Sequence, residues 1–369
     1  MKVAIVFGTR PEAIKLAPVA KEFQRRGHTP LVIVTAQHRD MLDQHVRDFG
    51  IVPDVDLDIM RENQDLGYVT TEVLRRLDAV LKREAPGALL VQGDTTTTFA
   101  SSLAAFYNRI PVGHVEAGLR TWNRYLPYPE EINRQLTTRL ATWHFAPTEW
   151  SKNNLLKEQV PADSVFVTGN TVIDVLLETL QMQREFEDPV LRGIDYDHRR
   201  VILLTAHRRE NFGAPMENVC RACLNIVRQL DDVELVYPVH PNPNVRRVVR
   251  KLLGEEPRVH LIEPLEYRPF VRLMNKCTLI LSDSGGVQEE APSLGKPVLV
   301  LRTVTERPEA VASGVVKLVG TDTQQITTEA LRLLTDPAAY QAMTTKANPY
   351  GDGKASQRIV DIITSALKP

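Results

Sequence analysis

Hydrophobic residues in this chain gather in short runs of β-branched and aliphatic residues, and each run is separated from the next by a longer segment with helical spacing. The runs lie at 3–7, 31–35, 88–92, 165–168, 201–205, 234–239, 279–282 and 297–301. The helical patterns cover about 11–26, 66–84, 95–108, 128–141, 171–185, 215–230, 243–253, 286–294 and 324–334. Apolar runs of this length, alternating with helices, are typical of parallel strands that are buried on both faces. The pattern therefore predicts an α/β fold.

The number of strands favours two domains over one, because a single doubly wound domain would need an unusually wide sheet. The best boundary follows VFVTGN, where Gly169 and Asn170 close a strand, and we expect a hinge near 170–198. This places one domain at 1–169 and a second at 170–353. The last helical pattern, 354–369, follows the breaker NPYGDG and is compatible with packing on either domain.

Composition excludes several classes of protein. The formal net charge of the 369 residues is -1, so nothing indicates an electrostatic nucleic-acid binder. Three cysteines cannot form a disulfide framework and suit a reducing, cytoplasmic compartment. The apolar start at 1–7 is too short for a signal peptide, and no run is long enough to cross a membrane, so we expect no membrane association.

The first strand runs directly into GTRPEAIKLAPVA, a turn that would expose backbone N–H groups at the carboxyl edge of the sheet. Arg10 and Lys15 place two cations beside the start of the following helix, where a basic residue opposes the helix dipole. An anionic ligand would explain them, and a solvated charge pair explains them equally well. The chain contains neither GxGxxG nor GxxxxGK[ST], so nicotinamide and P-loop nucleotide sites are poorly supported.

Carboxylates follow three successive strand ends, in VQGDTTTT, VGHVEAGLR and PYPEEINR. The residues are Asp94, Glu116 and Glu130, the last followed directly by Glu131. Each one alone is more typical of a helix cap or a first-turn acid than of a catalyst. Three at the same edge favour a carboxylate-lined cleft, in which mutual repulsion tunes a general base.

The second half of the chain carries groups suited to an anion. His207 lies in TAHRRENFG and His240 in YPVHPNP, each directly after a strand. In LSDSGGVQEEA a strand ends and a helix begins, and Ser284 is placed to cap the start of that helix. Gly285 and Gly286 would let a ligand come close to the backbone there.

Two further groups complete this candidate phosphate site. Glu289 and Glu290 allow two interpretations. One of them accepts hydrogen bonds from ligand hydroxyls, or both only interact favourably with the helix dipole at the start of the helix. Arg307 in TERPEA has the fork that binds phosphate with two hydrogen bonds. Together these residues favour phosphate binding over ordinary loop chemistry.

The sequence also contains HVE at 114–116 and CRAC at 220–223, a superficial match to a zinc deaminase pattern. Val219 stands where that pattern has proline, and about a hundred residues separate the two parts. We therefore expect no metal site.

These motifs resemble the non-hydrolysing UDP-N-acetylglucosamine 2-epimerases over essentially the whole chain. The matching segments, in order, are FGTRPEAIKLAPV, TAQHRDMLDQ, VQGDTTT, HVEAGLRT, PEEINR, FVTGNTVID, HRRENFG, YPVHPNPNV, DSGGVQEEAPSLGKPVLVLR and TERPEAV. The resemblance implies a GT-B-like fold, in which two Rossmann-like domains place parallel sheets on a central cleft that holds the active site. It also implies a homodimer that interconverts UDP-GlcNAc and UDP-ManNAc without an external redox cofactor.

The resemblance also assigns roles to residues of this chain. It implies nucleotide contacts at Arg10, His207, Ser284, Gly285, Gly286, Glu290 and Arg307, with His207 also catalytic, and uracil contacts at Phe270 and the backbone of Leu265. Lys15, Asp94, Glu116 and Glu130 would line the sugar and the reaction centre. A second, regulatory UDP-GlcNAc site is suggested at Gln37, His38, Gln64 and His240.

The expected chemistry has two steps. UDP first leaves C-1 of the sugar while a carboxylate removes the C-2 proton, which gives 2-acetamidoglucal. UDP then adds back to C-1, and C-2 is protonated on the other face. Two alternatives keep the same nucleotide site. A GT-B glycosyltransferase would also need an acceptor groove, and a UDP-sugar sensor would not need three carboxylates.

Overall fold

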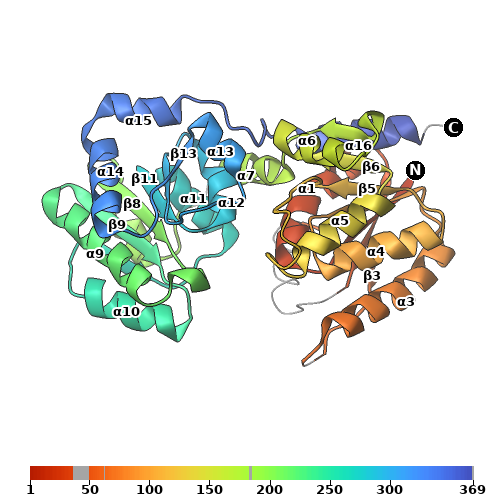
Figure 1. The fold of residues 1–369 in the computed structure, drawn as a ribbon, viewed down its shortest axis with the longest axis horizontal. Coiled ribbons are helices and arrows are strands. Elements are labelled where there is room, and N and C mark those ends of the chain that lie inside the picture. Colours follow the sequence, from red (N-terminus) through yellow and green to blue (C-terminus); the bar gives the residue numbers. More distant parts are fainter. Residues whose placement is uncertain (36–49, 62, 183–184, 368–369) are drawn as a thin grey trace. The chain divides into compact units, whose positions relative to one another are not determined.

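A computed structural model of the chain describes residues 1–35, 50–61, 63–182 and 185–367. The chain divides into two compact units, Met1–Val175 together with Tyr350–Pro369, and Leu176–Pro349 (Figure 1). The division falls inside helix α7 (Thr171–Gln181), a little beyond the boundary expected after Gly169. The last helix of the chain, α16 (Ala355–Ala366), belongs to the first unit.

The described residues of the first unit form a seven-stranded parallel sheet in the order β3-β2-β1-β4-β5-β6-β7. The strands are β1 (Lys2–Phe7), β2 (Thr29–Val34), β3 (Val55–Asp56), β4 (Ala88–Gln92), β5 (Val112–Val115), β6 (Trp143–Ala146) and β7 (Val165–Val167). The helices are α1 (Arg10–Arg25), α3 (Leu66–Glu84), α4 (Thr96–Tyr107), α5 (Glu130–Leu140), α6 (Glu149–Lys157), α7 and α16, with a 3-10 turn at Ala162–Ser164.

The apolar runs form the centre of this sheet because helices cover both of its faces. Strand β1, with sequence KVAIVF, is buried from Val3 to Phe7, and β4 is buried along its whole length. Helix α3 contributes one apolar stripe, including Val73 and Leu77, to the same core. Because all the strands are parallel, their carboxyl ends meet at one edge of the sheet.

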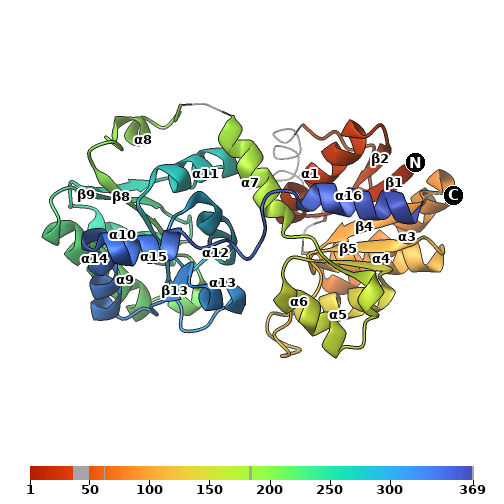
Figure 2. The same cartoon turned by 90° about the horizontal axis from the view of Figure 1, so that it is seen from above.

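Helix α16 closes the first unit by returning to its beginning, and Figure 2 shows it beside α1. Arg26 at the end of α1 forms an ion pair with Asp361. At the other end of α16, the carboxylate of Asp174 accepts hydrogen bonds from the backbone N–H groups of Ala355 (3.1 Å) and Ser356 (2.8 Å). Of the C-terminal pattern at 354–369, the described helix α16 therefore packs on the N-terminal part of the chain.

The described residues of the second unit form a six-stranded parallel sheet in the order β10-β9-β8-β11-β12-β13. Its strands are β8 (Arg200–Thr205), β9 (Val233–Pro238), β10 (Val259–Ile262), β11 (Leu279–Ser282), β12 (Val298–Val300) and β13 (Val316–Leu318). Its helices are α8 (Pro189–Gly193), α9 (Ala214–Gln229), α10 (Pro243–Leu253), α11 (Tyr267–Lys276), α12 (Gly285–Glu290), α13 (Pro308–Ser313), α14 (Thr323–Thr335) and α15 (Pro337–Thr344), with 3-10 turns at Arg209–Asn211 and Ala291–Leu294. Strands β8, β9 and β11 and helices α9, α10 and α14 supply most of its core.

The structure differs from the sequence expectation in four strands and in several helices. Strands β3, β6, β10 and β13 have no continuous apolar run to reveal them, and helices α6, α11 and α15 were not expected. The helix expected at 286–294 is the short α12 followed by a 3-10 turn, and Pro292 stands at the start of that turn, where it cannot donate a helical hydrogen bond. Within the described residues, no helix is both long and apolar enough to span a membrane.

Candidate functional site

Glu116 lies directly after β5, at the carboxyl edge of the first sheet. Its backbone is in the left-handed region with φ 62°, a conformation that costs about 1–3 kcal/mol in a residue other than glycine. The Lys15 ammonium lies 2.6 Å from its Oε2 atom, and the Gln92 side-chain amide donates to the same oxygen. The Glu116 side chain is only 5% exposed, so Lys15 and Gln92 largely replace water around its carboxylate.

Asp94 lies after β4 and is held from two sides by α5. The Arg134 guanidinium is 2.8 Å from its carboxylate, and the Asn133 side-chain amide donates to its backbone carbonyl at 3.0 Å. The sequence suggested Asp94 as an ordinary start signal for α4. Thr95 performs that task instead, because its hydroxyl accepts the N–H of Thr98 at 3.1 Å, and this leaves the Asp94 carboxylate for Arg134.

Glu130 does not follow a strand end, contrary to the sequence expectation. Strand β5 ends at Val115, and Glu130 is the first residue of α5, four positions before Arg134. Its Oε2 atom is buried, and no hydrogen-bond partner reaches it from the described residues. Glu130 therefore differs from Asp94 and Glu116, each of which has a cation against its carboxylate.

Sequence reasoning missed Glu12, a buried carboxylate that fixes two of the turns. One oxygen accepts the N–H groups of Gly8 (3.1 Å) and Thr9 (2.8 Å), and the other accepts the hydroxyls of Thr95 (2.7 Å) and Thr98 (3.1 Å). Burial raises the pKa of Glu12, although these hydrogen bonds counteract it. Its position in a capping box at the start of α1, where Arg10 is the first residue, was the signal available in the sequence.

His207 follows β8 in the second unit, and a buried carboxylate supports it. Asp283 accepts the N–H groups of His207 and Arg208, both at 2.9 Å, and the Asn211 side-chain amide at 3.0 Å. Its second oxygen lies 3.4 Å from Nδ1 of His207. The His240 ring stacks on the His207 ring with centroids 5.6 Å apart. Burial lowers the pKa of His240, and the charge of His207 lowers it further.

The Ser284 turn is a helix start, as the sequence predicted. Ser284 occupies the N-cap position of α12, but its side chain makes no capping hydrogen bond. Nε of Arg307 lies 2.7 Å from Oε1 of Glu289, and a Cβ atom added at Gly285 would lie 3.5 Å from the Arg307 guanidinium. Gly285 therefore leaves the guanidinium close to the beginning of α12.

The hydroxyl group of Tyr267 donates to Oε2 of Glu290 at 2.9 Å. Burial and the neighbouring Glu290 raise the pKa of Tyr267 well above its ordinary value. A Cβ atom at Gly286 would lie 3.5 Å from the other oxygen of Glu290. Leu265 precedes α11, Phe270 lies within it, and both are half-buried.

The remaining predicted positions are less constrained. Gln37 and His38 lie outside the described residues, and Gln64 lies just before Asp65, the N-cap of α3. The described residues bring His240 to His207 within the second unit, but they do not bring Gln64 to His240 within one unit.

The cysteines and histidine of the deaminase-like pattern do not form a metal site in the described residues. Cys220 and Cys223 are buried on α9, and burial raises the pKa of the Cys220 thiol to about 12. His114 is fully buried in the first unit, donates to the carbonyl of Gly93 at 2.7 Å, and has a pKa that burial lowers to about 3. Thiols that resist ionisation are poor metal ligands.

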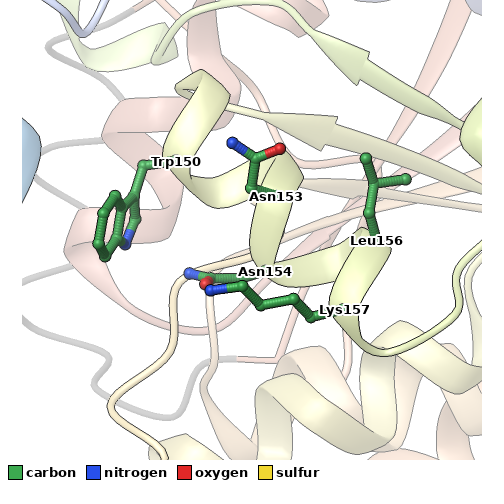
Figure 3. Close-up of a pocket in the computed structure, with 5 residues that line it drawn as sticks. All are labelled: Trp150, Asn153, Asn154, Leu156 and Lys157. Atoms are coloured by element: carbon green, nitrogen blue, oxygen red, sulfur yellow. The ribbon is translucent and has the colours of Figure 1, made fainter.

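A shallow pocket of the first unit lies along α6. Trp150, Asn153, Asn154, Leu156 and Lys157 line it, and Figure 3 shows these side chains on successive turns of the helix. The Lys157 ammonium is 6.0 Å from the centre of the Trp150 ring. None of the residues predicted for the site is among those that line this pocket.

Comparison with known proteins gives a consistent result. The family model for UDP-N-acetylglucosamine 2-epimerase matches residues 21–364. The UDP-N-acetylglucosamine 2-epimerase of Bacillus subtilis is 57% identical over 362 residues, which cover 98% of this chain and 94% of that protein.

Solved structures agree with the sequence matches. The crystal structure of UDP-GlcNAc 2-epimerase from Neisseria meningitidis bound to UDP-GlcNAc superposes with a TM-score of 0.89 at 54% identity and covers 99% of this chain and 100% of that one. The enzyme from Methanocaldococcus jannaschii in complex with UDP-GlcNAc and UDP gives a TM-score of 0.79 at 34% identity, over 99% and 100% of the two chains. The predicted α/β fold with two parallel sheets, GT-B-like in kind, is confirmed.

Proposed function

This chain belongs to the UDP-N-acetylglucosamine 2-epimerase family, and we propose that it interconverts UDP-GlcNAc and UDP-ManNAc by elimination and re-addition of UDP. The relatives from N. meningitidis and M. jannaschii were crystallised with UDP-GlcNAc, which supports the same substrate here. The geometry at Glu116 carries the proposal, because a strained residue at a strand end holds a nearly dry carboxylate against a lysine.

The chemistry explains why a held carboxylate is needed. The proton at C-2 of the sugar is not acidic in the ground state, since no carbonyl adjoins it. As the C-1–O bond breaks, its electron pair leaves with UDP and positive charge develops at C-1. The C-2 proton then passes to a carboxylate, and the C–H electron pair forms the C-1–C-2 double bond of 2-acetamidoglucal. Re-addition of UDP with protonation of the opposite face of C-2 gives the epimer.

We assign the proton transfers to the carboxylates of the first unit. Glu116 and Asp94 each lie against a cation, at 2.6 and 2.8 Å, and this supports them as carboxylates that are held in one direction. Glu130 opens α5, and its Oε2 atom has no hydrogen-bond partner among the described residues. Arg10 and Lys15 lie in the first two turns of α1, the helix that follows the carboxyl end of β1.

We assign the leaving diphosphate to the second unit. Arg307 supplies positive charge, the His207 ring can donate a hydrogen bond, and the α12 start at Ser284, Gly285 and Gly286 supplies backbone N–H groups. In the same unit Glu290 is suited to the ribose hydroxyls, and Phe270 and the backbone of Leu265 to the uracil, as the family resemblance implies. The route transfers no hydride, so it requires no redox cofactor.

A single incubation tests the proposed function. Purified protein with UDP-GlcNAc alone should form UDP-ManNAc, detected by proton NMR, and the same mixture should form from UDP-ManNAc. A glycosyltransferase would leave UDP-GlcNAc unchanged until an acceptor is supplied, and a sensor would bind it without turnover. Absence of UDP-ManNAc in the presence of tight UDP binding would contradict the proposal.

We further propose that the protein acts as a homodimer in the cytoplasm and that His240 and Gln64, with Gln37 and His38, form a regulatory UDP-GlcNAc site. The stacking of His240 on His207 supports a link between such a site and the diphosphate. Light scattering of the purified chain should give twice the monomer mass of 41.5 kDa.

A further inference from the structure

Helix α5 sends polar side chains to two of the turns that carry the proposed chemistry. Arg134 lies 2.8 Å from the carboxylate of Asp94 and 3.6 Å from that of Glu131, so one guanidinium bridges two carboxylates. Asn133 holds the backbone carbonyl of Asp94 at 3.0 Å. Asp94 is therefore fixed at both its side chain and its backbone by two residues of the PEEINR segment, Asn133 and Arg134, to which the sequence assigned no role.

Glu131 fixes the segment that follows Glu116. It is fully buried, and it accepts the N–H groups of Thr121 (3.0 Å) and Trp122 (3.1 Å) and the hydroxyl of Thr121 (3.1 Å). The Gln135 side-chain amide donates to it at 2.9 Å. Trp122 has a left-handed backbone with φ 62°, a conformation that persists only where its surroundings hold it.

Both charges are expensive to bury, and this makes their contacts informative. The Arg134 side chain is 8% exposed and that of Glu131 is fully buried, and buried charges cost free energy unless they are paired. Arg26 provides a contrast in the same unit. It follows α1 directly, away from the strand ends, and it pairs with Glu22 (2.7 Å) and Asp361, neither of which the proposed reaction uses.

We propose that Arg134 and Glu131 are positioning residues for the epimerisation. Arg134 fixes the direction and charge of the Asp94 carboxylate, and Glu131 fixes Arg134 together with the backbone that follows Glu116. The guanidinium is needed because a planar fork can contact two carboxylates at once, whereas an ammonium is a single point charge. This inference rests on the proposed function, since Asp94 must act on the substrate for its direction to matter.

A double-mutant cycle between Arg134 and Asp94 tests the inference. We expect Arg134→Met to lower kcat about tenfold to a hundredfold, because a misplaced reacting group costs rates of that order, while KM and UDP affinity stay within about twofold. Arg134→Lys should retain an intermediate kcat. In an Asp94→Asn background, Arg134→Met should lower kcat by less than about a further twofold, because the effects of residues that act through one another are not additive.

Arg26→Lys is the matched control for loss of a paired guanidinium. It should lower the melting temperature without lowering kcat. An Arg134→Met variant with the parent kcat would overturn the inference, and so would losses for Arg134→Met and Asp94→Asn that multiply. An equal kcat loss in Arg26→Lys and Arg134→Lys would overturn it too, by showing that the loss of any paired guanidinium in this unit lowers kcat through the fold. The unaltered protein is assayed first. If it forms no UDP-ManNAc, the proposed function itself fails, and that failure is seen before any variant is compared.

Discussion

The two units build the same kind of parallel sheet but reverse the charges at its carboxyl edge. In the first unit the candidate reactive groups are carboxylates held by cations, Glu116 by Lys15 and Asp94 by Arg134. In the second unit the candidate ligand groups are Arg307 and His207, and buried carboxylates hold both. Glu289 lies 2.7 Å from Arg307, and Asp283 accepts the backbone N–H of His207 at 2.9 Å.

This reversal matches two different chemical demands. Removing a proton from carbon requires a carboxylate that is kept charged and directed, whereas binding a leaving diphosphate requires positive charge that is kept in place. In both units a partner of opposite charge reduces the cost of holding these groups away from water. One architecture can therefore carry base chemistry at one sheet and anion binding at the other.

The comparison predicts its largest effect at the first unit. Replacing Glu116 by Gln, or Asp94 by Asn, keeps the shape of the side chain but removes its charge. Turnover should fall about a hundredfold or more, the usual contribution of general acid–base catalysis. UDP affinity measured by calorimetry should remain at the parent value, because we assign the UDP anchors to the second unit.

Glu22→Gln is the control for this experiment, since Glu22 is also buried and paired with Arg25 and Arg26 but lies away from the strand ends on α1. It should change the melting temperature and leave turnover intact. A hundredfold loss of UDP affinity in Glu116→Gln would show that the two edges do not divide their tasks in this way.

The second unit should show the opposite response. Arg307→Ala should weaken UDP binding by about 1.5–3 kcal/mol, the scale of hydrogen bonds to a charged group. Lys317→Ala removes a cation of the same unit that is paired with Glu329 at 2.7 Å, and it should leave UDP affinity unchanged. Unchanged calorimetric affinity in Arg307→Ala would remove this arginine from the proposed nucleotide site.

A smaller effect is expected where His240 stacks on His207. We predict a sigmoidal dependence of rate on UDP-GlcNAc, and slow reaction of UDP-ManNAc unless some UDP-GlcNAc is present, because an activator must bind one state of the protein better than another. His240→Ala should make the saturation curve more nearly hyperbolic. Hyperbolic curves in both directions for the unaltered protein would count against a regulatory site.

The sequence predicted the central part of both sheets because their strands are long apolar runs, such as VAIVF and VILLT. The edge strand β7 was also visible, but the edge strands β3, β10 and β13 and the strand β6 beside β7 were not. Strand β6 reads WHFA and β13 reads VKL, and in both a polar residue and short length hide a period. Periodicity therefore finds buried strands better than it finds marginal ones.

The candidate site was predictable where a residue follows a strand directly, as Glu116 and His207 do. The partners were not predictable, since they come from elsewhere in the chain. Lys15 lies 101 positions from Glu116, and Asp283 lies 76 positions from His207. Arg134 belongs to the PEEINR segment, but the sequence does not show where its side chain lies. The packing of α5 shows that its guanidinium contacts the Asp94 carboxylate and is largely shielded from solvent.

The smallest effect concerns the segment that precedes Arg307. Burial alone would raise the pKa of Glu306, but hydrogen bonds and charge from Arg302 hold it at about 2, below the ordinary 4.5. A carboxyl whose folded-state pKa is depressed stabilises the fold above pH 4.5, and this stability is lost as the pH falls toward 2.

Denaturant unfolding of the parent and Glu306→Gln can measure this contribution. The parent should be more stable by about 1–3 kcal/mol at neutral pH, and the difference should shrink as the pH falls from 4.5 toward 2. A difference that stays constant over this range would mean that the Arg302 pair does not control the Glu306 charge.

Our central claim is that the first unit removes the C-2 proton and the second unit binds the leaving UDP. The most direct test measures how much solvent deuterium enters C-2 of the product. When UDP-GlcNAc is converted in deuterium oxide, the proton taken by a carboxylate of the first unit exchanges with solvent before the opposite face is protonated. The UDP-ManNAc formed should therefore carry deuterium at C-2 in mass spectrometry and NMR. An oxygen label in the bridge at C-1 should also scramble into non-bridging phosphate positions, because the C-1–O bond breaks and the freed phosphate can rotate. UDP-ManNAc without deuterium at C-2 and with its bridge label intact would contradict the elimination of UDP on which this division rests.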